Sequence, residues 1–440
     1  MSRLRSSSVP EGRSARAHQW RVCGEGWRTG PALIALAGLG VILLTGCGGS
    51  ARHAKPAAAK HVVVATTTAT KHVTVSSSGP LSTAGPDWPT LLHSGSHFGA
   101  ATVAGPSTGH VRWQRRLEGP ITPGPVTVGN TAYVASNGGV LHAIDIQTGK
   151  DRWSFRGGPN GGSASGSSDL STSPTVLRDG LILWPGPSNR LFALTSSGRR
   201  LWTVSAPGDP LTPAVDQARH LLVVADTSGG LSGYRLSAGD RGPVRLWSHS
   251  LASTSFGSPA LAANGTTYET AGDSLFAVAA NGSVLWRVTT PGKVEVSAAV
   301  GDDGTVVFGS DNLQEYGVAP DGFILWHHAI GNLTYSSPLA LIGNRVVYGN
   351  HSGEMTTLDT RDGHVISVDH AAGQLWTAAA VDDHGDAYFA SQTGGIYGFG
   401  PSGRRLFALQ TNTKFDSYPA IAADGTLLVG GGDGVLRAIG

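Results

Sequence analysis

The sequence predicts an all-β fold, an eight-bladed β-propeller of four-stranded antiparallel blades, and three observations lead to this prediction. Glycine and proline account for 63 and 24 of the 440 residues, while charged residues are only 14%. This composition disfavours helices and is typical of short strands between turns. A turn glycine followed four residues later by Trp recurs at spacings of 39 to 49 residues. A small residue, usually followed by Pro and an apolar strand, recurs with a similar period and gives the same count.

Each repeat contains four predicted strands. The first landmark occupies eight equivalent positions: Trp113, Trp153, Trp202, Trp247, Trp286, Trp326, Ser367 and Phe407. The second landmark begins at Gly124, Ser173, Thr212, Ser258, Ser297, Ser337, Ala378 and Tyr418. Two further alternating strands fit between the landmarks, as at 131–136 and 140–145. Four antiparallel strands in each repeat of this length describe one propeller blade.

The two ends of the repeat region predict how the ring closes. The chain ends at Gly440, one strand short of a complete eighth unit. Residues 111–117 contain a Trp but are not preceded by the other three strands of a unit. We therefore expect this early strand to join the last blade, which removes an exposed sheet edge and ties the two ends of the propeller together.

Charge is distributed unevenly along the chain. Residues 1–46 contain six arginines and two glutamates, and residues 47–86 contain four basic and no acidic residues. The remainder contains 22 basic and 28 acidic residues. Nucleic-acid binding depends on clustered lysine and arginine. The net negative charge of residues 87–440 therefore argues against a nucleic-acid partner.

The N-terminal region is typical of an exported protein. Arg21 and Arg28 precede an apolar run at 31–44, which is shorter than the roughly 20 residues of a membrane span. The segment Leu44-Thr45-Gly46-Cys47 resembles the bacterial lipobox, in which the Cys thiol accepts a lipid and becomes the new N-terminus. We therefore expect residues 1–46 to be a lipoprotein signal peptide and Cys47 to be lipidated. The alternative is a poorly cleaved anchor helix with an incidental Cys.

Residues 47–86 are expected to form a disordered cationic tether. They contain no aromatic residue, and such a segment cannot bury enough surface to offset its chain entropy. Cys23, the other cysteine, would leave with the signal peptide, so the mature chain would have no disulfide. These features predict a monomer that is lipid-anchored to the cell membrane on its extracytoplasmic side.

Residues 87–440 also resemble a known family. Asp87-Trp88-Pro89, the segment 145–153 and the Ser-Pro strand starts are similar to the PQQ-type repeats of eight-bladed quinoprotein propellers. The resemblance is strongest to the non-enzymatic propeller lipoproteins related to the B subunit of the outer-membrane β-barrel assembly machine. It implies an interaction scaffold whose partners are envelope proteins or polymers.

An enzymatic function is the alternative that the resemblance leaves open. Quinoprotein dehydrogenases of this superfamily bind PQQ with an adjacent Cys pair, a Trp beneath the quinone and a calcium ion. The Cys pair is absent from this sequence. Trp184 and Trp376 are available aromatic residues, but neither is assigned to a quinone site. We therefore expect no enzyme activity and no catalytic, cofactor-binding or metal-binding residues, with a PQQ-dependent dehydrogenase as the alternative.

Other candidate sites have simpler explanations. His327 and His328 are adjacent, so on a strand their side chains point to opposite faces and make a poor metal pair. The acidic segments 302–304 and 382–386 lie at the same place in the repeat, which favours hairpin turns over calcium sites. Residues 157–169 are rich in Gly and Ser without the Lys of a phosphate loop, and we interpret them as a flexible insertion.

One set of positions predicts a binding surface. These residues lie three positions before each landmark Pro, where the chain enters the innermost strand: Thr122, Ser171, Pro210, Phe256, Glu295, Tyr335, Trp376 and Asp416. The repeat places all eight around one mouth of the central channel. Phe256, Glu295, Tyr335, Trp376 and Asp416 form a candidate binding rim, suited to a peptide strand, a cationic ligand or a sugar face. The alternative is that these aromatic residues fill gaps between the blades.

Overall fold

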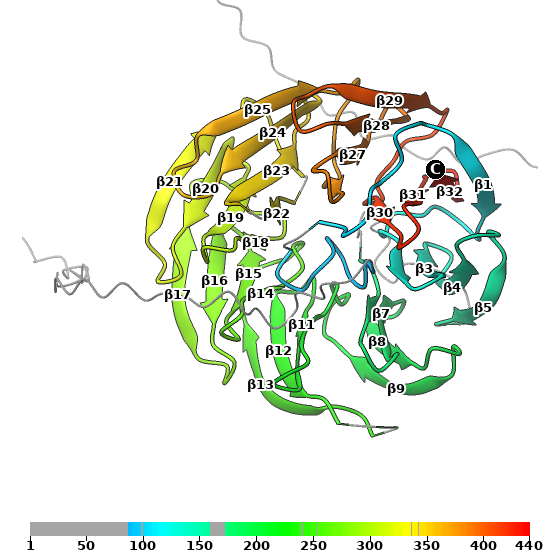
Figure 1. Cartoon of the computed structure of the whole chain (residues 1–440). Coiled ribbons are helices and arrows are strands. Elements are labelled where there is room, and N and C mark those ends of the chain that lie inside the picture. The colour runs from blue at the N-terminus through cyan, green and yellow to red at the C-terminus, as the bar shows by residue number, and fades with distance from the viewer. Residues whose placement is uncertain are drawn as a thin grey trace, which may run out of the picture. The chain divides into compact units, whose positions relative to one another are not determined.

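Eight four-stranded antiparallel sheets form a ring, as the repeat predicts (Figure 1). The computed structural model describes residues 87–440 except 98–99, 159–171, 238, 240, 252, 336 and 342. All of the described residues belong to one unit of the chain, His72–Gly440. Among the described residues no helix is sufficiently long and apolar to cross a bilayer. The predicted signal peptide, Cys47, the tether and most of the 157–169 insertion lie outside the described residues.

The first four blades each run from an innermost strand at the axis to an outermost strand at the edge. Blade 1 contains β2 (Val126–Val128), β3 (Thr131–Ser136), β4 (Val140–Asp145) and β5 (Asp151–Arg156). Blade 2 contains β6 (Thr175–Val176), β7 (Ile182–Gly186), β8 (Arg190–Leu194) and β9 (Arg200–Ser205). Blade 3 contains β10 (Ala214–Asp216), β11 (Leu221–Ala225), β12 (Gly230–Arg235) and β13 (Val244–Ser250). Blade 4 contains β14 (Ala260–Leu261), β15 (Thr267–Ala271), β16 (Ser274–Val278) and β17 (Val284–Thr289).

The other four blades follow the same order. Blade 5 contains β18 (Ala299–Val300), β19 (Val306–Ser310), β20 (Gln314–Val318) and β21 (Ile324–Ala329). Blade 6 contains β22 (Leu339–Leu341), β23 (Arg345–Gly349), β24 (Glu354–Asp359) and β25 (Val365–His370). Blade 7 contains β26 (Ala380–Val381), β27 (Ala387–Ala390), β28 (Gly395–Phe399) and β29 (Arg405–Gln410). Blade 8 contains β30 (Ala420–Ile421), β31 (Leu427–Gly430), β32 (Val435–Ile439) and, as its outermost strand, β1 (Val111–Arg116).

The predicted closure of the ring is confirmed. β1 pairs antiparallel with β32, and Trp113 lies opposite Ala438. Figure 1 shows β1 beside β32, close to the C-terminus. The strand β1 therefore supplies the outer edge of the most C-terminal blade, and all eight sheets of the ring have four strands.

The recurring Trp and Gly lock consecutive blades together. Five of the outer-strand tryptophans donate their indole N–H to a carbonyl in the last turn of the next blade, at 2.7–3.0 Å: Trp113, Trp153, Trp247, Trp286 and Trp326. The turn glycine packs beneath the ring. At Gly149, whose φ is +67°, an added Cβ would lie 2.8 Å from the Trp113 ring. The motif is therefore one repeated contact between blades, which requires both a left-handed residue and the absence of a side chain.

The apolar core lies between the blades. Each of the eight apolar clusters in the described part of the chain contains residues from two consecutive blades. The cluster between blades 4 and 5, for example, joins Tyr268 and Leu275 to Phe308. Since each sheet buries its faces against its two neighbours, the blades depend on ring closure for much of their apolar burial.

Residues 87–97, which we call the plug, lie across one end of the central channel. Their backbone pairs with inner strands in four blades: Trp88 with Thr127, Pro89 with Val176, Gly95 with Leu261 and Ser96 with Val300. Just after the plug, Ala101 donates to the Val381 carbonyl. Figure 1 shows this segment, in blue, passing across the middle of the ring. Sequence reasoning used Asp87-Trp88-Pro89 only as a family signature and did not predict this role.

The plug is held in place by buried contacts. Trp88 and Leu92 are 2% and 1% exposed, and the Trp88 ring meets His93 edge to face. Leu92, His93 and His97 have positive φ angles of 52°, 73° and 55°. Because left-handed backbone is unfavourable for side chains of this kind, such residues are retained only where the surrounding structure fixes them.

Candidate functional site

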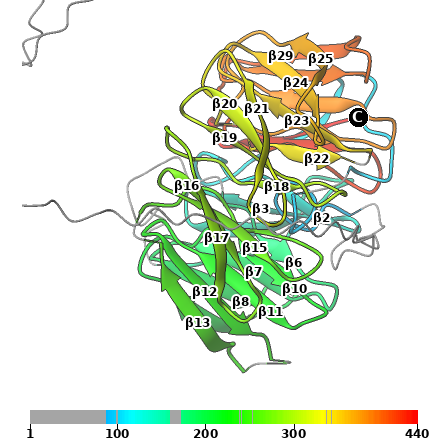
Figure 2. The same cartoon turned by 90° about the vertical axis from the view of Figure 1, so that its left-hand side faces the viewer.

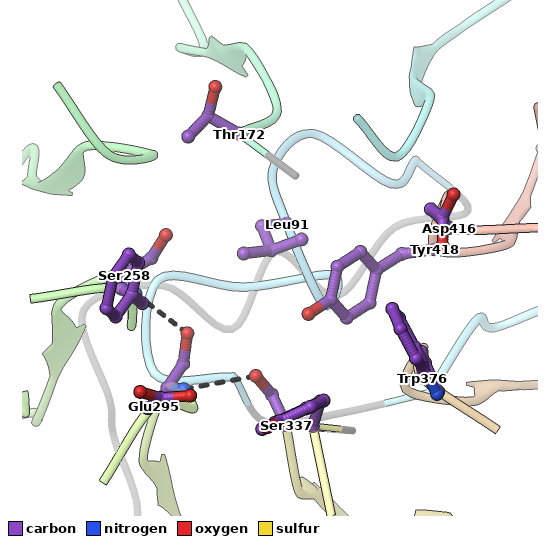
Figure 3. Close-up of a pocket in the computed structure, with 11 residues that line it drawn as sticks. Leu91, Thr172, Ser258, Glu295, Ser337, Trp376, Asp416 and Tyr418 are labelled. Atoms are coloured by element: carbon purple, nitrogen blue, oxygen red, sulfur yellow. Dashed lines mark hydrogen bonds between the residues drawn. The ribbon is translucent and has the colours of Figure 1, made fainter. Parts of the chain in front are cut away.

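All five residues of the predicted rim line a single cavity of about 370 Å³. Leu91 of the plug forms part of its lining, and Figure 3 shows this side chain in the middle of the surrounding residues. The volume lies near the lower end of the range for ligand sites, which is about 300–1,000 Å³. The structure therefore brings together side chains that are as much as 160 residues apart in the sequence, from Phe256 to Asp416.

The cavity opens at the end of the channel that the plug does not cover. Each rim residue precedes the first residue of its inner strand, as Glu295 precedes β18. The plug instead pairs with the last residues of inner strands, Leu261 of β14 and Val300 of β18. The inner strands run along the channel, so their two ends lie at opposite ends of it. The rim residues precede the strands and lie at one end, whereas the plug pairs with the last residues of strands and lies at the other. We call the end that carries the rim the mouth.

Three aromatic rings form a cluster on one side of the mouth. His351 stacks on Trp376 with ring centroids 5.3 Å apart, and Tyr335 meets both rings edge to face at 4.8 and 5.8 Å. All three side chains are half-buried. Burial lowers the pKa of His351, which keeps this ring neutral at neutral pH. Phe256, from the loop before β14, lines the same cavity and is 45% exposed.

Two carboxylates line the mouth on either side of Leu91 (Figure 3). Glu295 precedes blade 5 and Asp416 precedes blade 8. A lysine two residues earlier pairs with each: Lys293 Nζ lies 3.6 Å from Glu295, and Lys414 Nζ lies 3.1 Å from Asp416. Gln392 also donates its side-chain amide to Asp416. Among the described lining residues none is a lysine or an arginine.

A layer of hydroxyl groups lies beneath the rim. Ser258 donates its backbone N–H to the Ser297 hydroxyl at 2.8 Å, and Ser297 donates its own N–H to the Ser337 hydroxyl at 3.1 Å (Figure 3). These bonds link the inner strands of consecutive blades. Tyr418 hydrogen-bonds Ser337, which lies two blades away, and its side chain points towards the channel centre. Burial raises the pKa of the Tyr418 phenol.

Two of the other three positions, Thr122 and Pro210, do not line the cavity. Thr122 is buried and donates its hydroxyl to Asn137, and Pro210 forms a bridge with Asp226. Ser171 lies outside the described residues, although its neighbour Thr172 lines the cavity. The rim is therefore concentrated in blades 4 to 8, as the aromatic and acidic residues indicate.

The remaining predicted candidates are structural. Asp382 accepts hydrogen bonds from the backbone of His384 and Asp386 and from the Tyr388 hydroxyl, as expected of a hairpin turn. Asp303 likewise accepts from the Thr305 backbone. These contacts confirm that both acidic segments form turns.

The aromatic residues and histidines that were set aside as candidates have equally ordinary roles. His327 and His328 point to opposite sides of β21, paired with Tyr316 and Glu315. Trp184 is buried between blades 1 and 2, stacked on Phe192, and does not reach the mouth. Of the two aromatic residues considered for a quinone site, only Trp376 lines the cavity.

Sequence reasoning missed several residues of the site. Leu91 and Tyr418 line the cavity, and His351 packs against Trp376 from the hairpin between β23 and β24. Tyr418 had a detectable signal, because it occupies the small-residue landmark position. Leu91 precedes the repeats and His351 lies in a variable turn, so the repeat alone could not indicate either.

Two fully buried glutamates lie close to the loops that carry rim residues. Ser255, next to Phe256, donates its hydroxyl to Glu269, and burial followed by the charge of Asp226 raises the pKa of this carboxyl well above its usual range. Burial raises the pKa of Glu315 to about 8, and neither of its oxygens has a hydrogen-bond partner among the described residues. Both carboxyls are therefore protonated at neutral pH.

The outer edge of the ring differs from one half to the other. Two exposed apolar side chains stand at the start of the outermost strand in blades 4 to 6: Val284 and Leu285, Ile324 and Leu325, Val365 and Ile366. The corresponding positions in blades 1, 2, 7 and 8 include Arg152, Arg200, Arg405 and Arg112. Figure 2 turns the apolar side towards the viewer and shows β17 and β21 on the near face.

Comparison with known sequences agrees with this architecture. The family described as outer membrane protein assembly factor BamB matches residues 97–255 and 244–431. The chain belongs to this family. A BamB protein of Burkholderia pseudomallei (strain K96243) is 25% identical over 324 residues, which cover 63% of this chain and 84% of the relative. The resemblance to PQQ-type propellers of the BamB kind is therefore confirmed.

Solved structures share the fold of this BamB family member. BamB from Moraxella catarrhalis aligns with a TM-score of 0.58 at 14% identity, covering 75% of this chain and 96% of that one. Quinohemoprotein alcohol dehydrogenase from Comamonas testosteroni aligns with a TM-score of 0.60 at 14% identity, covering 80% of each chain. At these identities the likeness shows a common propeller architecture and does not distinguish a scaffold from an enzyme.

Proposed function

We propose that this chain is a lipid-anchored, extracytoplasmic scaffold that binds other proteins of the cell envelope. The observation that carries the proposal is the exposed apolar outer edge of blades 4 to 6, where Leu285 is 53% exposed. Monomeric soluble proteins rarely gather apolar side chains on one side unless a partner covers them. The outermost strands also have one unpaired edge each, to which a partner can add a strand.

Family membership supports a partner in the envelope. The relative from Burkholderia pseudomallei is named an outer membrane protein assembly factor. We propose that this chain likewise works in a protein assembly at a membrane, held there through lipid on Cys47. The tether at 47–86 sets the reach of the propeller, and its four basic and no acidic residues favour anionic lipid or wall polymer.

Site-specific crosslinking in cells tests the scaffold. A photoreactive residue in place of Leu285 or Leu325 is expected to capture a partner protein, whereas the same residue at Arg152, on the charged half of the edge, serves as the matched control. Leu285→Arg combined with Leu325→Arg should abolish capture from a third apolar position, Ile366, without unfolding the ring. Equal capture from Arg152 and Leu285 would contradict the proposal.

The lipid anchor has its own test. Cys47→Ser removes the only thiol that can accept lipid in the mature chain. The variant is expected to leave the membrane fraction, and mass spectrometry of the wild-type N-terminal peptide should show a diacylglycerol-modified Cys47. An unmodified peptide that begins before residue 47 would instead support the anchor-helix alternative.

The alternative function is a PQQ-dependent dehydrogenase, because the chain shares its fold with a quinohemoprotein alcohol dehydrogenase. The mouth does not fit this cofactor. PQQ carries several carboxylates, and no lysine or arginine stands among the described residues that line the mouth to pair with them. The purified chain mixed with PQQ and calcium is expected to give neither a shifted quinone spectrum nor alcohol-dependent dye reduction, and either signal would favour the enzyme.

A further inference from the structure

The charged side chains and the aromatic rings that line the mouth both favour a positively charged ligand. Its two ionised lining side chains are carboxylates, and its aromatic rings present electron-rich faces. The pKa of Tyr335 is raised, first by burial and then by the negative charges of Glu295 and Asp311. The potential inside the mouth is therefore negative, which favours a cationic occupant over an anionic one.

Each carboxylate pairs with one exposed lysine of the chain itself. Lys293 and Lys414, their partners, are 71% and 56% exposed and approach from outside the cavity. Exposed ion pairs of this kind contribute only about 0–1 kcal/mol. By contrast, the Glu295 and Asp416 side chains are 23% and 13% exposed. A cation that enters the cavity would therefore meet partly desolvated carboxylates and could replace the solvated lysines as their partner.

The shape of the mouth suits one extended side chain. Its floor is closed by Leu91 and Tyr418, and the rings of Phe256, Tyr335 and Trp376 form its aromatic walls. An apolar wall next to a carboxylate matches a side chain with an aliphatic stem and a cationic end, because the stem packs on the rings while the charge reaches the acid. The closed floor prevents a chain from threading through the ring.

We propose that the mouth binds a single lysine or arginine side chain, presented by an extended segment of a partner protein. Either Glu295 or Asp416, which lie on opposite sides of Leu91, binds the cationic end, and Phe256 and Trp376 contact the stem. That the partner is a protein rests on the proposed scaffold function, whereas the preference for a cation rests on the mouth alone. Lys293 and Lys414 act as internal competitors that set how tightly the segment is held.

Fluorescence anisotropy with the full-length chain tests this assignment. The probes are labelled ten-residue glycine–serine peptides with two central residues that are arginine, norleucine or glutamate. The arginine peptide should bind about ten-fold or more tightly than the norleucine peptide, and the glutamate peptide should bind weakest. An oligomer of N-acetylglucosamine serves as the sugar probe and should not compete with the arginine peptide.

Two double variants give opposite expected shifts. Glu295→Gln with Asp416→Asn should weaken the arginine peptide about ten-fold while leaving the norleucine peptide unchanged. Lys293→Ala with Lys414→Ala should instead tighten the arginine peptide by about two- to five-fold, because the competing cations are gone. Far-ultraviolet circular dichroism and thermal unfolding of each variant establish that the ring remains folded.

The outcomes separate this inference from the scaffold function. Equal binding of the arginine and norleucine peptides, or binding that survives loss of both carboxylates, overturns the cation site, as does displacement by the sugar probe. Leu285→Arg with Leu325→Arg alters the outer edge and should leave arginine-peptide binding intact. Crosslinking at Leu285 that persists in the Glu295→Gln, Asp416→Asn variant would show that the scaffold survives when the mouth is disabled.

Discussion

The two ends of the central channel are built from the same eight repeats and yet differ completely. At one end the plug forms backbone hydrogen bonds with blades 1, 2, 4 and 5 and buries Trp88 and Leu92. At the other end, five different side chains at equivalent repeat positions surround an open cavity of about 370 Å³. A repeat fixes the backbone at both ends equally, so the difference arises from the one segment that is not part of any repeat.

The comparison indicates where this fold can vary. Substitutions in the plug act on backbone pairing with blades 1, 2, 4 and 5 and on packing against blades 6, 7 and 8. Substitutions at the mouth act on partly exposed side chains that line an open cavity. We therefore expect plug variants to change stability and mouth variants to change binding.

The largest effect is expected from Trp88→Ala. This side chain is 2% exposed and packs with residues of blades 7 and 8 such as Tyr388 and Phe415, so its removal should lower the free energy of unfolding by about 3–5 kcal/mol. Urea unfolding measures the loss. A decrease below about 1 kcal/mol would show that the ring does not depend on the plug.

The next effect concerns the buried Glu315. Its carboxyl ionises near pH 4.5 in the unfolded chain, while burial raises the pKa in the folded protein to about 8. Below pH 4.5 the carboxyl is protonated in both states, and its full contribution to the free energy of unfolding is present. This contribution is lost as the pH rises towards 8, because the unfolded chain ionises and the folded chain does not. The loss amounts to about 3 kcal/mol between pH 4.5 and 7.

Glu315→Leu should remove this dependence and stabilise the protein at pH 7. The equivalent position is apolar in the other seven blades: Leu141, Leu191, Leu231, Leu275, Met355, Ile396 and Leu436. Glu315→Gln is the matched control, which cannot ionise but keeps a buried polar group. Urea unfolding between pH 4.5 and 8 should be flatter for both variants than for the wild type, and an unchanged slope would contradict the assignment.

A pH effect of opposite sign is expected at the plug. Burial lowers the pKa of His97 to about 4, although its Nδ1 lies 2.7 Å from the Ala298 carbonyl. The folded state thus disfavours the protonated ring, and stability is lost as the pH falls from 6.5 towards 4, by at most about 3 kcal/mol. His97→Gln should reduce the slope of stability in this acidic window only. A slope that persists unchanged would assign the acid sensitivity to other groups.

The smallest effect on stability is expected at the mouth. Trp376→Ala removes one stacked and one edge-to-face contact from a half-buried cluster, which should cost about 1–2 kcal/mol. The same change should nevertheless abolish binding of the arginine peptide. Phe256→Ala, at a 45% exposed side chain, should have a still smaller effect on stability. A loss of stability at Trp376 as large as that at Trp88 would support the view that these aromatic residues mainly fill gaps between blades.

Much of the fold could be predicted because the same pattern of four strands and their turns recurs in all eight blades. The spacing of Trp113 and its equivalents gave the blade count, and the strand missing before Gly440 gave the closure through residues 111–117. The rim residues were found for the same reason, since equivalent positions in a ring converge on its axis. Leu91 and His351 could not be found this way, because one precedes the repeats and the other lies in a turn that differs between blades.

The sequence by itself determined the blade, its number and the way the ring closes, since strand alternation, turn glycines and the Trp–Gly contact are all local or repeated properties. Only the tertiary structure decided which end of the channel is open. The position of the plug depends on hydrogen bonds between residues 87–97 and strands as far along the chain as Val300. These hydrogen bonds are not part of the repeat, so the spacing of the sequence motifs does not predict them. The same holds for Glu315, whose raised pKa comes from burial between blades rather than from its neighbours in sequence.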